Sequence, residues 1–440
     1  MNAAVSTHPL RHVAPMLCTV LVLFFIPACK ATQPTATGPI KTEIRQTADG
    51  FRLYRGGEPY FIMGGGGDSD YLDKLAEHGG NSIRTWGTGG AQELLDRAHE
   101  LGMTVTLGLN VTGERHGFDY DDEEAVAAQL ARLREEVLRY KDHPALIIWA
   151  IGNELNLRSE NPKVWDAVND ISKMIHEVDP NHLTTTTLAG VNPELIAHLN
   201  ERAPDLDLLA IQLYGGIVNL PRHISEIPIT KPYIVTEWGA TGHWEVPVAT
   251  WGAAIENNSS VKADGYLERY QNVIAADTRQ CLGSYVFLWG QKQERTPTWY
   301  GVFLASGEET EAVDVMHYIW TGAWPDNRAP RLEGMTLDGR IATDMIRVQA
   351  GAPIPVEAQA TDPDGDDLTF TWDLKPESTD LGEGGDFETT PESIPGLIEG
   401  QGQPQATLTA PSEPGAYRLF VYVFDGNDNA AHANIPFFVE

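Results

Sequence analysis

Two stretches of the sequence decide how the rest is read: Trp149-Ala150-Ile151-Gly152-Asn153-Glu154 and Ile234-Val235-Thr236-Glu237-Trp238-Gly239. Each is an apolar run typical of a buried strand, and each ends abruptly on a glutamate beside a polar or aromatic residue. A carboxylate at the mouth of a buried strand costs free energy unless partners compensate its charge. Taken singly, each glutamate also fits a salt-bridged strand end or a neighbour of a helix N-cap. Taken together, the two indicate a polar site at the ends of these strands.

Around these stretches, short apolar strands alternate with amphipathic helices. The segments expected as strands are 61–64, 82–86, 104–110, 145–151, 183–187, 208–213, 233–236 and 283–288, and the clearest helices are 91–101, 123–140, 163–178 and 266–276. A hairpin turning at Gly56-Gly57 leads into the first strand, and Asp121-Asp122-Glu123-Glu124 suits a helix N-terminus. Eight strands with helices between them predict an α/β fold, a (β/α)8 TIM barrel. Functional side chains of such a barrel lie at the C-terminal strand ends, where Glu154 and Glu237 fall.

The texture of the chain changes after a linker predicted at 326–331. Alternating strands at 354–360, 368–372, 406–408 and 417–424 carry no helical period between them. We therefore expect a small all-β, immunoglobulin-like sandwich over 332–440, following a catalytic barrel over 43–325. From residue 331 onward, acidic residues outnumber basic ones 20 to 5.

The N-terminus has the pattern of an export signal. Arg11 and His12 precede an apolar run, 13–28, which is too short to span a bilayer comfortably and fits the core of a signal peptide over 1–28. The run ends in Ala28-Cys29, which resembles a bacterial lipobox. Residues 29–42 then predict a flexible tether. We expect a cell-envelope lipoprotein, at the outer membrane or surface, touching the membrane only through a lipid on Cys29; periplasmic location or simple secretion is the alternative.

Bulk properties narrow the class of protein. The 440-residue chain carries a net charge of −31, which argues against nucleic acid and anionic lipid as partners. Of three cysteines, Cys18 leaves with the signal, Cys29 receives the lipid and Cys281 stands alone, so the core and not disulfides must hold the fold. No CxxC pair or HExxH motif is present, so we expect no catalytic metal and no cofactor.

At the two glutamates the sequence resembles a known group of enzymes. The strings IIWAIGNEL (147–155) and PYIVTEWG (232–239) look like the acid/base and nucleophile signatures of the clan A glycoside hydrolases, with the texture of the family 2 and family 5 barrels. The resemblance covers about residues 50–325. It implies that Glu154, at the end of strand four, is the general acid/base and that Glu237, at the end of strand seven, is the nucleophile.

The same resemblance assigns the residues around them. It implies that Asn153 bonds the substrate 2-hydroxyl, Arg84 braces the nucleophile, Tyr214 orients it and Trp289 floors the cleavage subsite. Tryptophans at strand ends also suit sugar stacking, and we expect Trp86 and Trp238 to bind substrate. Gln212 stands where relatives often have Asn or His, which leaves hydrogen bonding at that subsite open. His116 and His243 follow strands three and seven and would line the cleft. Because the chain has 11 tryptophans, some of them must be ordinary core aromatics.

The chemistry independently asks for this set. A retaining enzyme needs two carboxyl groups about 5–5.5 Å apart, one ionised and one protonated. An arginine and a phenol beside Glu237 favour its charged form, whereas Glu154 has no predicted cation beside it and keeps its proton. We expect a monomeric retaining hydrolase that cleaves β-linked neutral polysaccharide or oligosaccharide, of the β-glucan or β-mannan class, by double displacement.

Two alternatives stay open at this point. A transglycosylase resembling the fungal β-1,3-glucanosyltransferases would use the same two glutamates. A non-catalytic carbohydrate-binding surface protein would need neither of them, so the presence of both, with Asn153, argues for an enzyme.

Two further motifs have structural explanations beside functional ones. Gly64-Gly65-Gly66-Gly67 is followed by no GK[ST], so we read it as a close backbone approach at the barrel mouth and not as a phosphate cradle. In the C-terminal domain, the loops 362–367 and 425–429 resemble those of cadherin-like or polycystic-kidney-disease-like repeats. Their Asp and Asn oxygens suit a structural calcium ion, and equally such residues are common turn formers.

Overall fold

The computed structural model describes residues 37–440; the predicted signal peptide, Cys29 and most of the tether lie outside the described residues. Within the described part, the chain folds as a closed barrel followed by two four-stranded sheets, which are antiparallel apart from one short parallel pairing in the second. None of the helices in this part is both long and apolar enough to cross a membrane. The α/β class and the (β/α)8 barrel are confirmed.

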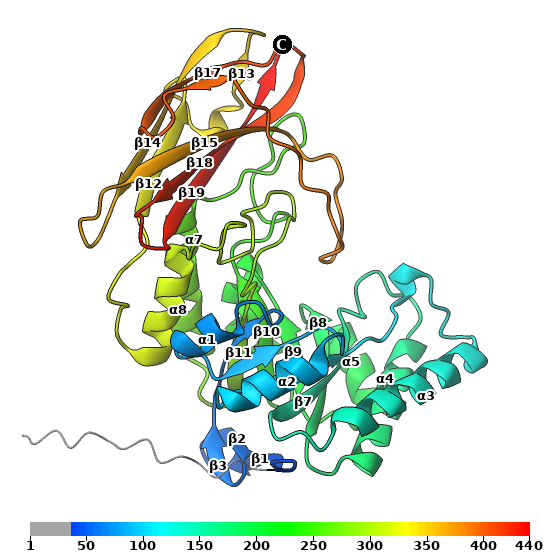
Figure 1. Cartoon of the computed structure of the whole chain (residues 1–440). Coiled ribbons are helices and arrows are strands. Elements are labelled where there is room, and N and C mark those ends of the chain that lie inside the picture. Colours follow the sequence, from blue (N-terminus) through cyan, green and yellow to red (C-terminus); the bar gives the residue numbers. More distant parts are fainter. Residues whose placement is uncertain (1–36) are drawn as a thin grey trace, which may run out of the picture. The chain divides into compact units, whose positions relative to one another are not determined.

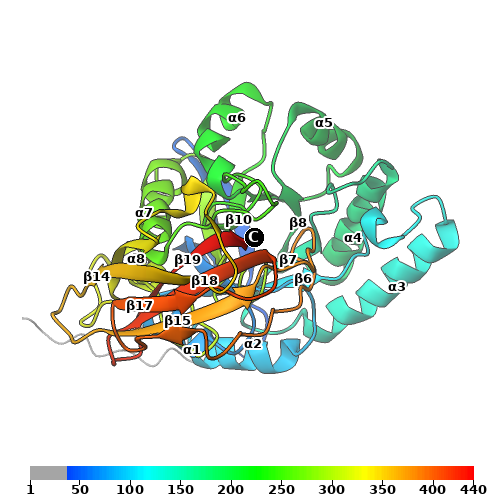
Figure 2. The ribbon, with the colours of Figure 1, turned by 90° about the horizontal axis from the view of Figure 1, so that it is seen from above.

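The barrel consists of eight parallel strands, each followed by a helix (Figures 1 and 2). The strands are β4 (Ile62–Gly66), β5 (Ser82–Arg84), β6 (Thr104–Leu109), β7 (Leu146–Asn153), β8 (Leu183–Ala189), β9 (Leu209–Gln212), β10 (Tyr233–Gly239) and β11 (Cys281–Phe287). The helices are α1 (Leu72–Glu77), α2 (Ala91–Glu100), α3 (Glu123–Tyr140), α4 (Lys163–Val178), α5 (Pro193–Arg202), α6 (Leu220–Glu226), α7 (Ser259–Arg269) and α8 (Glu311–Thr321). All eight predicted strands and three of the four predicted helices lie within a few residues of their predicted bounds, and α7 is the exception; α1, α5, α6 and α8 were not predicted.

Local sequence explains the ends of the helices. Asp122 caps α3, because its side chain accepts hydrogen bonds from the backbone N–H groups of Glu124 and Ala125. Helix α7 begins seven residues before its predicted start at 266, since Asn258 caps it by accepting a hydrogen bond from Val261 N, and a π-helical turn, Tyr270–Ile274, then extends it. The prediction for this helix was wrong about its first half.

A three-stranded antiparallel sheet covers the N-terminal end of the barrel. It is formed by β1 (Thr42–Thr47), β2 (Gly50–Arg55) and β3 (Glu58–Tyr60), and the predicted turn at Gly56-Gly57 joins the last two. Leu53 of this sheet packs into a buried cluster with Ile62 and Ile147 of the barrel. This end is therefore filled with apolar side chains, which leaves the other end for the site.

The glycine run in and after β4 permits the close approach predicted for it. A Cβ atom on Gly65 would lie 2.6 Å from the Cβ of Trp289, and one on Gly67 would lie 2.5 Å from the Trp289 carbonyl oxygen. Any side chain at either position would force β4 and the segment after β11 apart. The glycine run therefore allows β4 to pack closely against Trp289.

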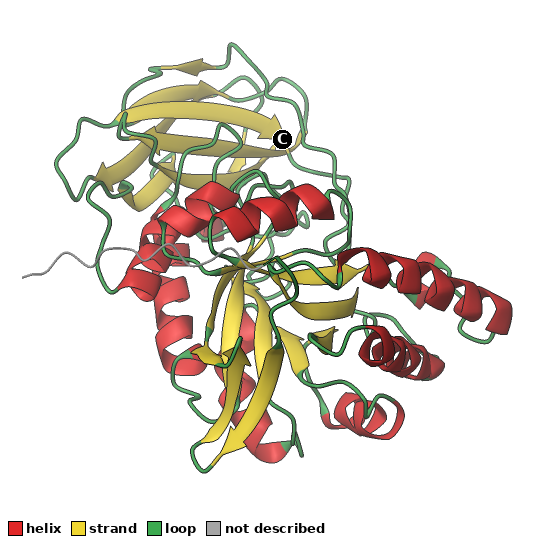
Figure 3. Cartoon of the chain, turned by 60° about the horizontal axis from the view of Figure 1, so that its bottom comes forward, coloured by secondary structure: helices red, strands yellow, loops and turns green. Residues whose placement is uncertain are grey.

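Beyond the barrel the chain forms strands and loops with almost no helix (Figure 3). One sheet has the order β12-β14-β17-β16 and the other β13-β19-β18-β15. Their bounds are β12 (Arg331–Leu337), β13 (Arg347–Val348), β14 (Pro353–Thr361), β15 (Thr369–Pro376), β16 (Ile398–Glu399), β17 (Gln405–Thr409), β18 (Gly415–Phe424) and β19 (Ala430–Val439). The two sheets share one apolar core, as a sandwich requires. The sequence prediction named counterparts of β14, β15, β17 and β18, and none of β12, β13, β16 or the long strand β19.

Candidate active site

Glu237 lies near the end of β10 and is held by four side-chain donors. Its Oε1 accepts hydrogen bonds from Arg84 Nη1 at 2.7 Å, Gln212 Nε2 at 2.8 Å and Trp86 Nε1 at 2.9 Å. Its Oε2 accepts from the Tyr214 hydroxyl at 2.8 Å. The carboxyl is buried, with 5% exposed. A guanidinium and three neutral donors around a buried carboxylate complement its charge and fix its orientation.

Asn153, the last residue of β7, is tied into the same network. Its Oδ1 accepts from Arg84 Nη2 at 2.6 Å, Gln212 Nε2 at 2.9 Å and Thr187 Oγ1 at 3.0 Å. Because Oδ1 accepts three hydrogen bonds, the other side-chain atom, Nδ2, is the one that can donate to a ligand. Gln212 thus fills the position that the sequence left open, since one amide donates to both Asn153 and Glu237.

Glu154 follows β7 directly and has the opposite surroundings. Its backbone adopts a left-handed conformation, φ +49°, and its N–H donates to Thr187 O at 3.0 Å. Among residues 37–440, no side chain or backbone group donates a hydrogen bond to its carboxyl. Burial, followed by the charge of Glu237, raises the pKa of Glu154 to about 8. At neutral pH this carboxyl holds its proton, as a general acid must.

Both carboxyl groups line one cavity of about 290 Å³ at the C-terminal ends of the strands. Its wall includes the aromatic rings of Trp86, Tyr214, Trp244 and Phe287, together with Lys292, Glu294, Gly384 and Gly385. The volume is at the lower end of the range for small-molecule sites and suits a single sugar ring. Aromatic faces beside fixed polar groups are the usual equipment of such a site.

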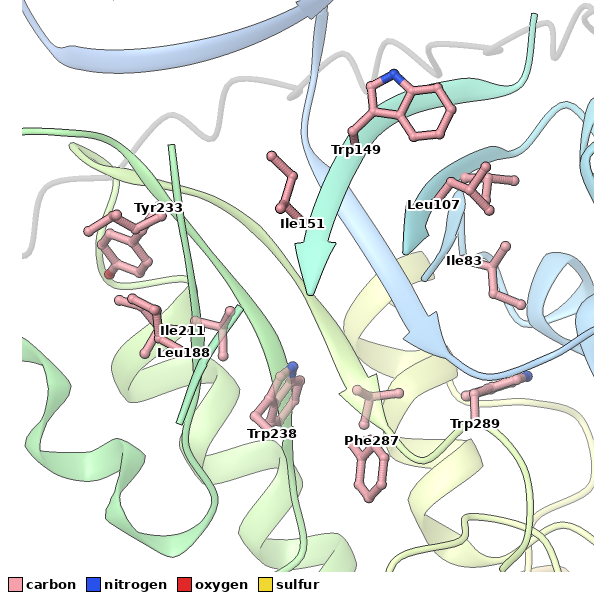
Figure 4. Close-up of a cluster of buried hydrophobic side chains, with 14 of the residues drawn as sticks. Ile83, Leu107, Trp149, Ile151, Leu188, Ile211, Tyr233, Trp238, Phe287 and Trp289 are labelled. Atoms are coloured by element: carbon pink, nitrogen blue, oxygen red, sulfur yellow. The ribbon is translucent and has the colours of Figure 1, made fainter. Parts of the chain in front are cut away.

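Two tryptophans expected at the substrate lie in the core instead. Trp238 is fully buried against Tyr266 and Tyr270, among other buried hydrophobic side chains (Figure 4). Because successive side chains of a strand point to opposite faces, it points away from Glu237. Trp289 is 1% exposed, packs against Phe303 and donates from Nε1 to Tyr71 O at 3.0 Å. Neither lines the cavity, so both expectations are corrected. At the end of β11, Phe287 and Leu288 take the lining position that was expected for Trp289.

The two histidines border neighbouring cavities that also contain Glu154. His243 lines a cavity of about 660 Å³ with Trp244 and Tyr214. His116 lines one of about 390 Å³ with Trp86. Burial lowers the pKa of His243 to about 4, so this ring is neutral over the physiological range.

Sequence reasoning missed several lining residues. Trp244, which is 60% exposed, was visible only as one of many aromatics. Lys292 and Glu294 follow the last strand and form an ion pair of 2.9 Å, and nothing in their spacing marked them. Gly384 and Gly385 come from the sandwich, and only the tertiary structure brings them to the barrel.

The acidic loops of the sandwich do converge. Carboxylate oxygens of Asp362, Asp366 and Asp425 lie within 4.8 Å of one another. However, Asp362 Oδ1 accepts from the N–H groups of residues 364, 365 and 366, and Asp425 Oδ1 accepts from those of Asn427 and Asn429. The donor type fits calcium, while the hydrogen bonds fit turns that satisfy themselves.

Comparison with known proteins agrees with this geometry. Residues 76–300 match the glycosyl hydrolases family 2 TIM barrel domain. Among solved structures, the chain is similar to Faecalibacterium prausnitzii beta-glucuronidase, with a TM-score of 0.51, 16% identity, and coverage of 64% of this chain and 52% of that one. Bifidobacterium dentium beta-glucuronidase gives a TM-score of 0.51 at 17% identity, covering 65% and 50%.

A family 5 mannosidase from Rhizomucor miehei gives a TM-score of 0.46 at 16% identity, covering 62% of this chain and 95% of that one. For the two glucuronidases the likeness at these identities concerns the fold alone, and the chain spans only about half of their length. The matched family segment, just over half of the 440 residues, contains both glutamates and Arg84, Asn153 and Tyr214. The chain therefore belongs to the glycosyl hydrolases of family 2.

Proposed function

We propose that the chain cleaves a β-linked neutral oligosaccharide or polysaccharide, of the β-glucan or β-mannan class, with retention of configuration. Glu154 protonates the leaving oxygen while Glu237 attacks the sugar carbon, which forms a glycosyl-enzyme. Glu154, now ionised, then takes a proton from water as the water displaces Glu237. The observation that supports this most is the contrast between the two carboxyl groups in one cavity, one with four donors and one with none.

The charges around the cavity support a neutral sugar. Glu237 and Glu294 both line it, and their carboxylates would repel a sugar carboxylate. The cation in its wall, Lys292, is paired with Glu294 at 2.9 Å. Arg84 is likewise paired with Glu237. A uronic acid would need a cation that these carboxylates do not already occupy.

A panel of p-nitrophenyl β-glycosides, including the glucoside, mannoside, galactoside and glucuronide, tests the substrate class. Proton NMR of the first product formed tests retention. Glu237→Gln should reduce kcat on the order of 10⁴-fold or more, with thermal unfolding nearly unchanged. The matched control is Glu268→Gln on the exposed face of α7, which should retain wild-type rates. An inverted product, or full activity of Glu237→Gln, would refute the mechanism.

Transglycosylation is a second candidate, favoured by the 660 Å³ cavity beside Glu154. This space, with the exposed ring of Trp244 in its wall, has room for an acceptor sugar. Product analysis with and without added acceptor oligosaccharide separates the two fates of the glycosyl-enzyme.

A further inference from the structure

A loop of the sandwich, residues 381–388 between β15 and β16, reaches the catalytic end of the barrel (Figure 1, orange). Its neck is closed, because Thr389 N donates to Asp380 Oδ2 at 2.9 Å. Inside the loop, Gly382 N donates to Glu388 Oε1 at 2.9 Å. A loop with close ends and internal bonds is a compact unit and not a slack connection.

Cations from three barrel loops hold it in place. Arg115, after β6, donates to Asp386 Oδ2 at 2.9 Å and to Glu383 O at 3.2 Å. Arg158, after β7, donates to Glu383 Oε1 at 2.9 Å. These three hydrogen bonds hold the loop on the side of the barrel mouth next to Glu154.

The last barrel loop holds the opposite side. Lys292 Nζ donates to Gly385 O at 3.0 Å and Arg295 Nη2 to Gly382 O at 3.0 Å. Arg295 also forms an ion pair with Glu388, of which only 2% is exposed. Buried charge-assisted bonds of this kind are the strong ones, so the loop spans the barrel mouth as a fixed bridge.

The bridge separates three cavities that all contain Glu154. Gly384 and Gly385 line the 290 Å³ cavity that holds both glutamates. Gly384 also lines the 660 Å³ cavity, and Gly385 the 390 Å³ one. Gly384 has φ +60°, and a Cβ atom there would lie 2.8 Å from Leu157. The positive φ and the close contact with Leu157 both favour glycine at this position.

We propose that loop 381–388 is part of the substrate-binding site, where it walls the leaving-group subsite and restricts the enzyme to short chains and chain ends. This inference rests on the proposed glycosidase function. The leaving group lies beside Glu154, and the 660 Å³ cavity contains Glu154 but not Glu237, together with Trp244 and Leu381. One sugar occupies the inner cavity and the next occupies this one. A polymer cannot lie across the mouth, because the bridge stands between the cavities.

The test replaces residues 381–388 by Asn-Gly, which the closed neck permits. The probes are the p-nitrophenyl glycoside that the wild type hydrolyses and the corresponding disaccharide to pentasaccharide. We expect the ratio of KM for the oligosaccharides to KM for the aryl glycoside to rise at least tenfold, since the activated leaving group of the aryl glycoside depends little on that subsite. On polymer, the variant should lower viscosity faster per reducing end released than wild type does.

The control variant Glu392→Gln/Glu399→Gln/Glu413→Gln removes the same number of charges at exposed sandwich positions and should behave as wild type. If the shortened loop prevents folding, Leu381→Ser tests the same ratio of KM for oligosaccharides to KM for the aryl glycoside. Its control is Ile341→Ser, because the two side chains have similar exposure (55% and 53%). A folded variant with wild-type KM ratios and cleavage pattern would overturn the inference. Wild-type protein inactive on every glycoside would instead overturn the proposed function, and the inference with it.

Discussion

Glu154 and Glu237 share a side chain and a cavity, yet their neighbours give them different chemistry. Glu237 receives bonds from Arg84, Trp86, Gln212 and Tyr214. Glu154 receives none from the described residues and lies close enough to Glu237 to feel its charge. Two titratable groups whose environments drive them to opposite protonation states are the usual arrangement of an acid and a nucleophile.

This asymmetry predicts the alkaline limb of the pH profile. Because burial and Glu237 raise the pKa of Glu154 to about 8, the acid stays protonated below that pH and loses its proton above it. The value of kcat/KM should therefore fall as pH rises through about 8. Initial rates on an aryl glycoside from pH 4 to 10 measure this. In Glu154→Gln, assayed with a 2,4-dinitrophenyl glycoside that needs no acid, the alkaline limb should vanish. Its persistence would assign the limb to another group.

Trp86 and Trp238 offer a matched pair of substitutions. Trp86→Phe removes the Nε1–H that bonds Glu237 Oε1 at 2.9 Å, so kcat should fall about tenfold, as expected for loss of one bond to a charged group. Trp238→Phe changes a buried ring whose Nε1 has no partner among the described residues. It should leave kcat and KM unchanged. Steady-state kinetics of both variants, with circular dichroism to confirm folding, decide the question. Equal effects on kcat would remove the distinction between site and core.

Residue types at strand ends predicted the hydrogen-bond network around Glu237. They predicted less well which tryptophans face the substrate cavity. Side chains alternate along a strand, so Glu237 and Trp238 had to point to opposite sides, and the alternation alone could have excluded Trp238. Trp289 is different, because it lies beyond the end of β11, where the period no longer applies. Its contact with Phe303 depends on the long loop that follows, which no local pattern describes.

At the scale of elements, two misreadings have the same physical origin. Strand β19 is buried on both faces, since one face fills the sandwich core and His432 N donates to Ser259 Oγ of α7 at 3.0 Å. Burial on both faces removes the alternation by which a strand is recognised. The first residue of α7, Ser259, makes this contact. The first turn of the helix buries Ser259, Ser260 and Lys262 where a helical pattern would have apolar residues, so the pattern did not reveal the start of the helix.

The cap of α7 carries a prediction. Asn258 Oδ1 accepts from Val261 N at 2.8 Å, so Asn258→Ala should destabilise the protein by about 1 kcal/mol, the usual cost of losing an N-cap. Urea unfolding followed by circular dichroism measures it. Asn272→Ala, at an exposed position of the following turn, is the control. A loss equal to that of the control would show that the cap contributes nothing beyond the helix contacts.

At the scale of the whole described chain, one buried carboxylate joins barrel and sandwich. Glu256 accepts from Thr298 Oγ1 at 3.0 Å, Thr296 Oγ1 at 2.5 Å and Asn434 Nδ2 of β19 at 2.6 Å, and it forms an ion pair with Lys262. Arg418 of β18 adds a bond from Nη2 to Ala254 O at 2.8 Å. The change in composition near 331 predicted two domains, but it could not predict this joint, because the residues that meet here are far apart in sequence.

The joint predicts that barrel and sandwich unfold together. Burial alone would raise the pKa of Glu256, but Lys262 and the hydrogen bonds lower it to about 2. The carboxylate therefore contributes stability above its unfolded pKa, near 4.5, and loses this contribution as pH falls toward 2. Near pH 7, calorimetry of the wild type should show one transition whose calorimetric and van't Hoff enthalpies agree.

Glu256→Ala should cost about 3–5 kcal/mol, because it leaves Lys262 buried without its partner, and should separate the transition into two. Glu399→Gln, on the exposed edge of the sandwich, serves as the control with one transition. Two separate transitions in the wild type would show that the domains are only tethered. In that case only its own ion pairs would keep loop 381–388 on the barrel, and high salt would raise KM for oligosaccharides by screening them. If the two domains unfold together, the sandwich itself holds the loop over the site, and salt should change this KM little.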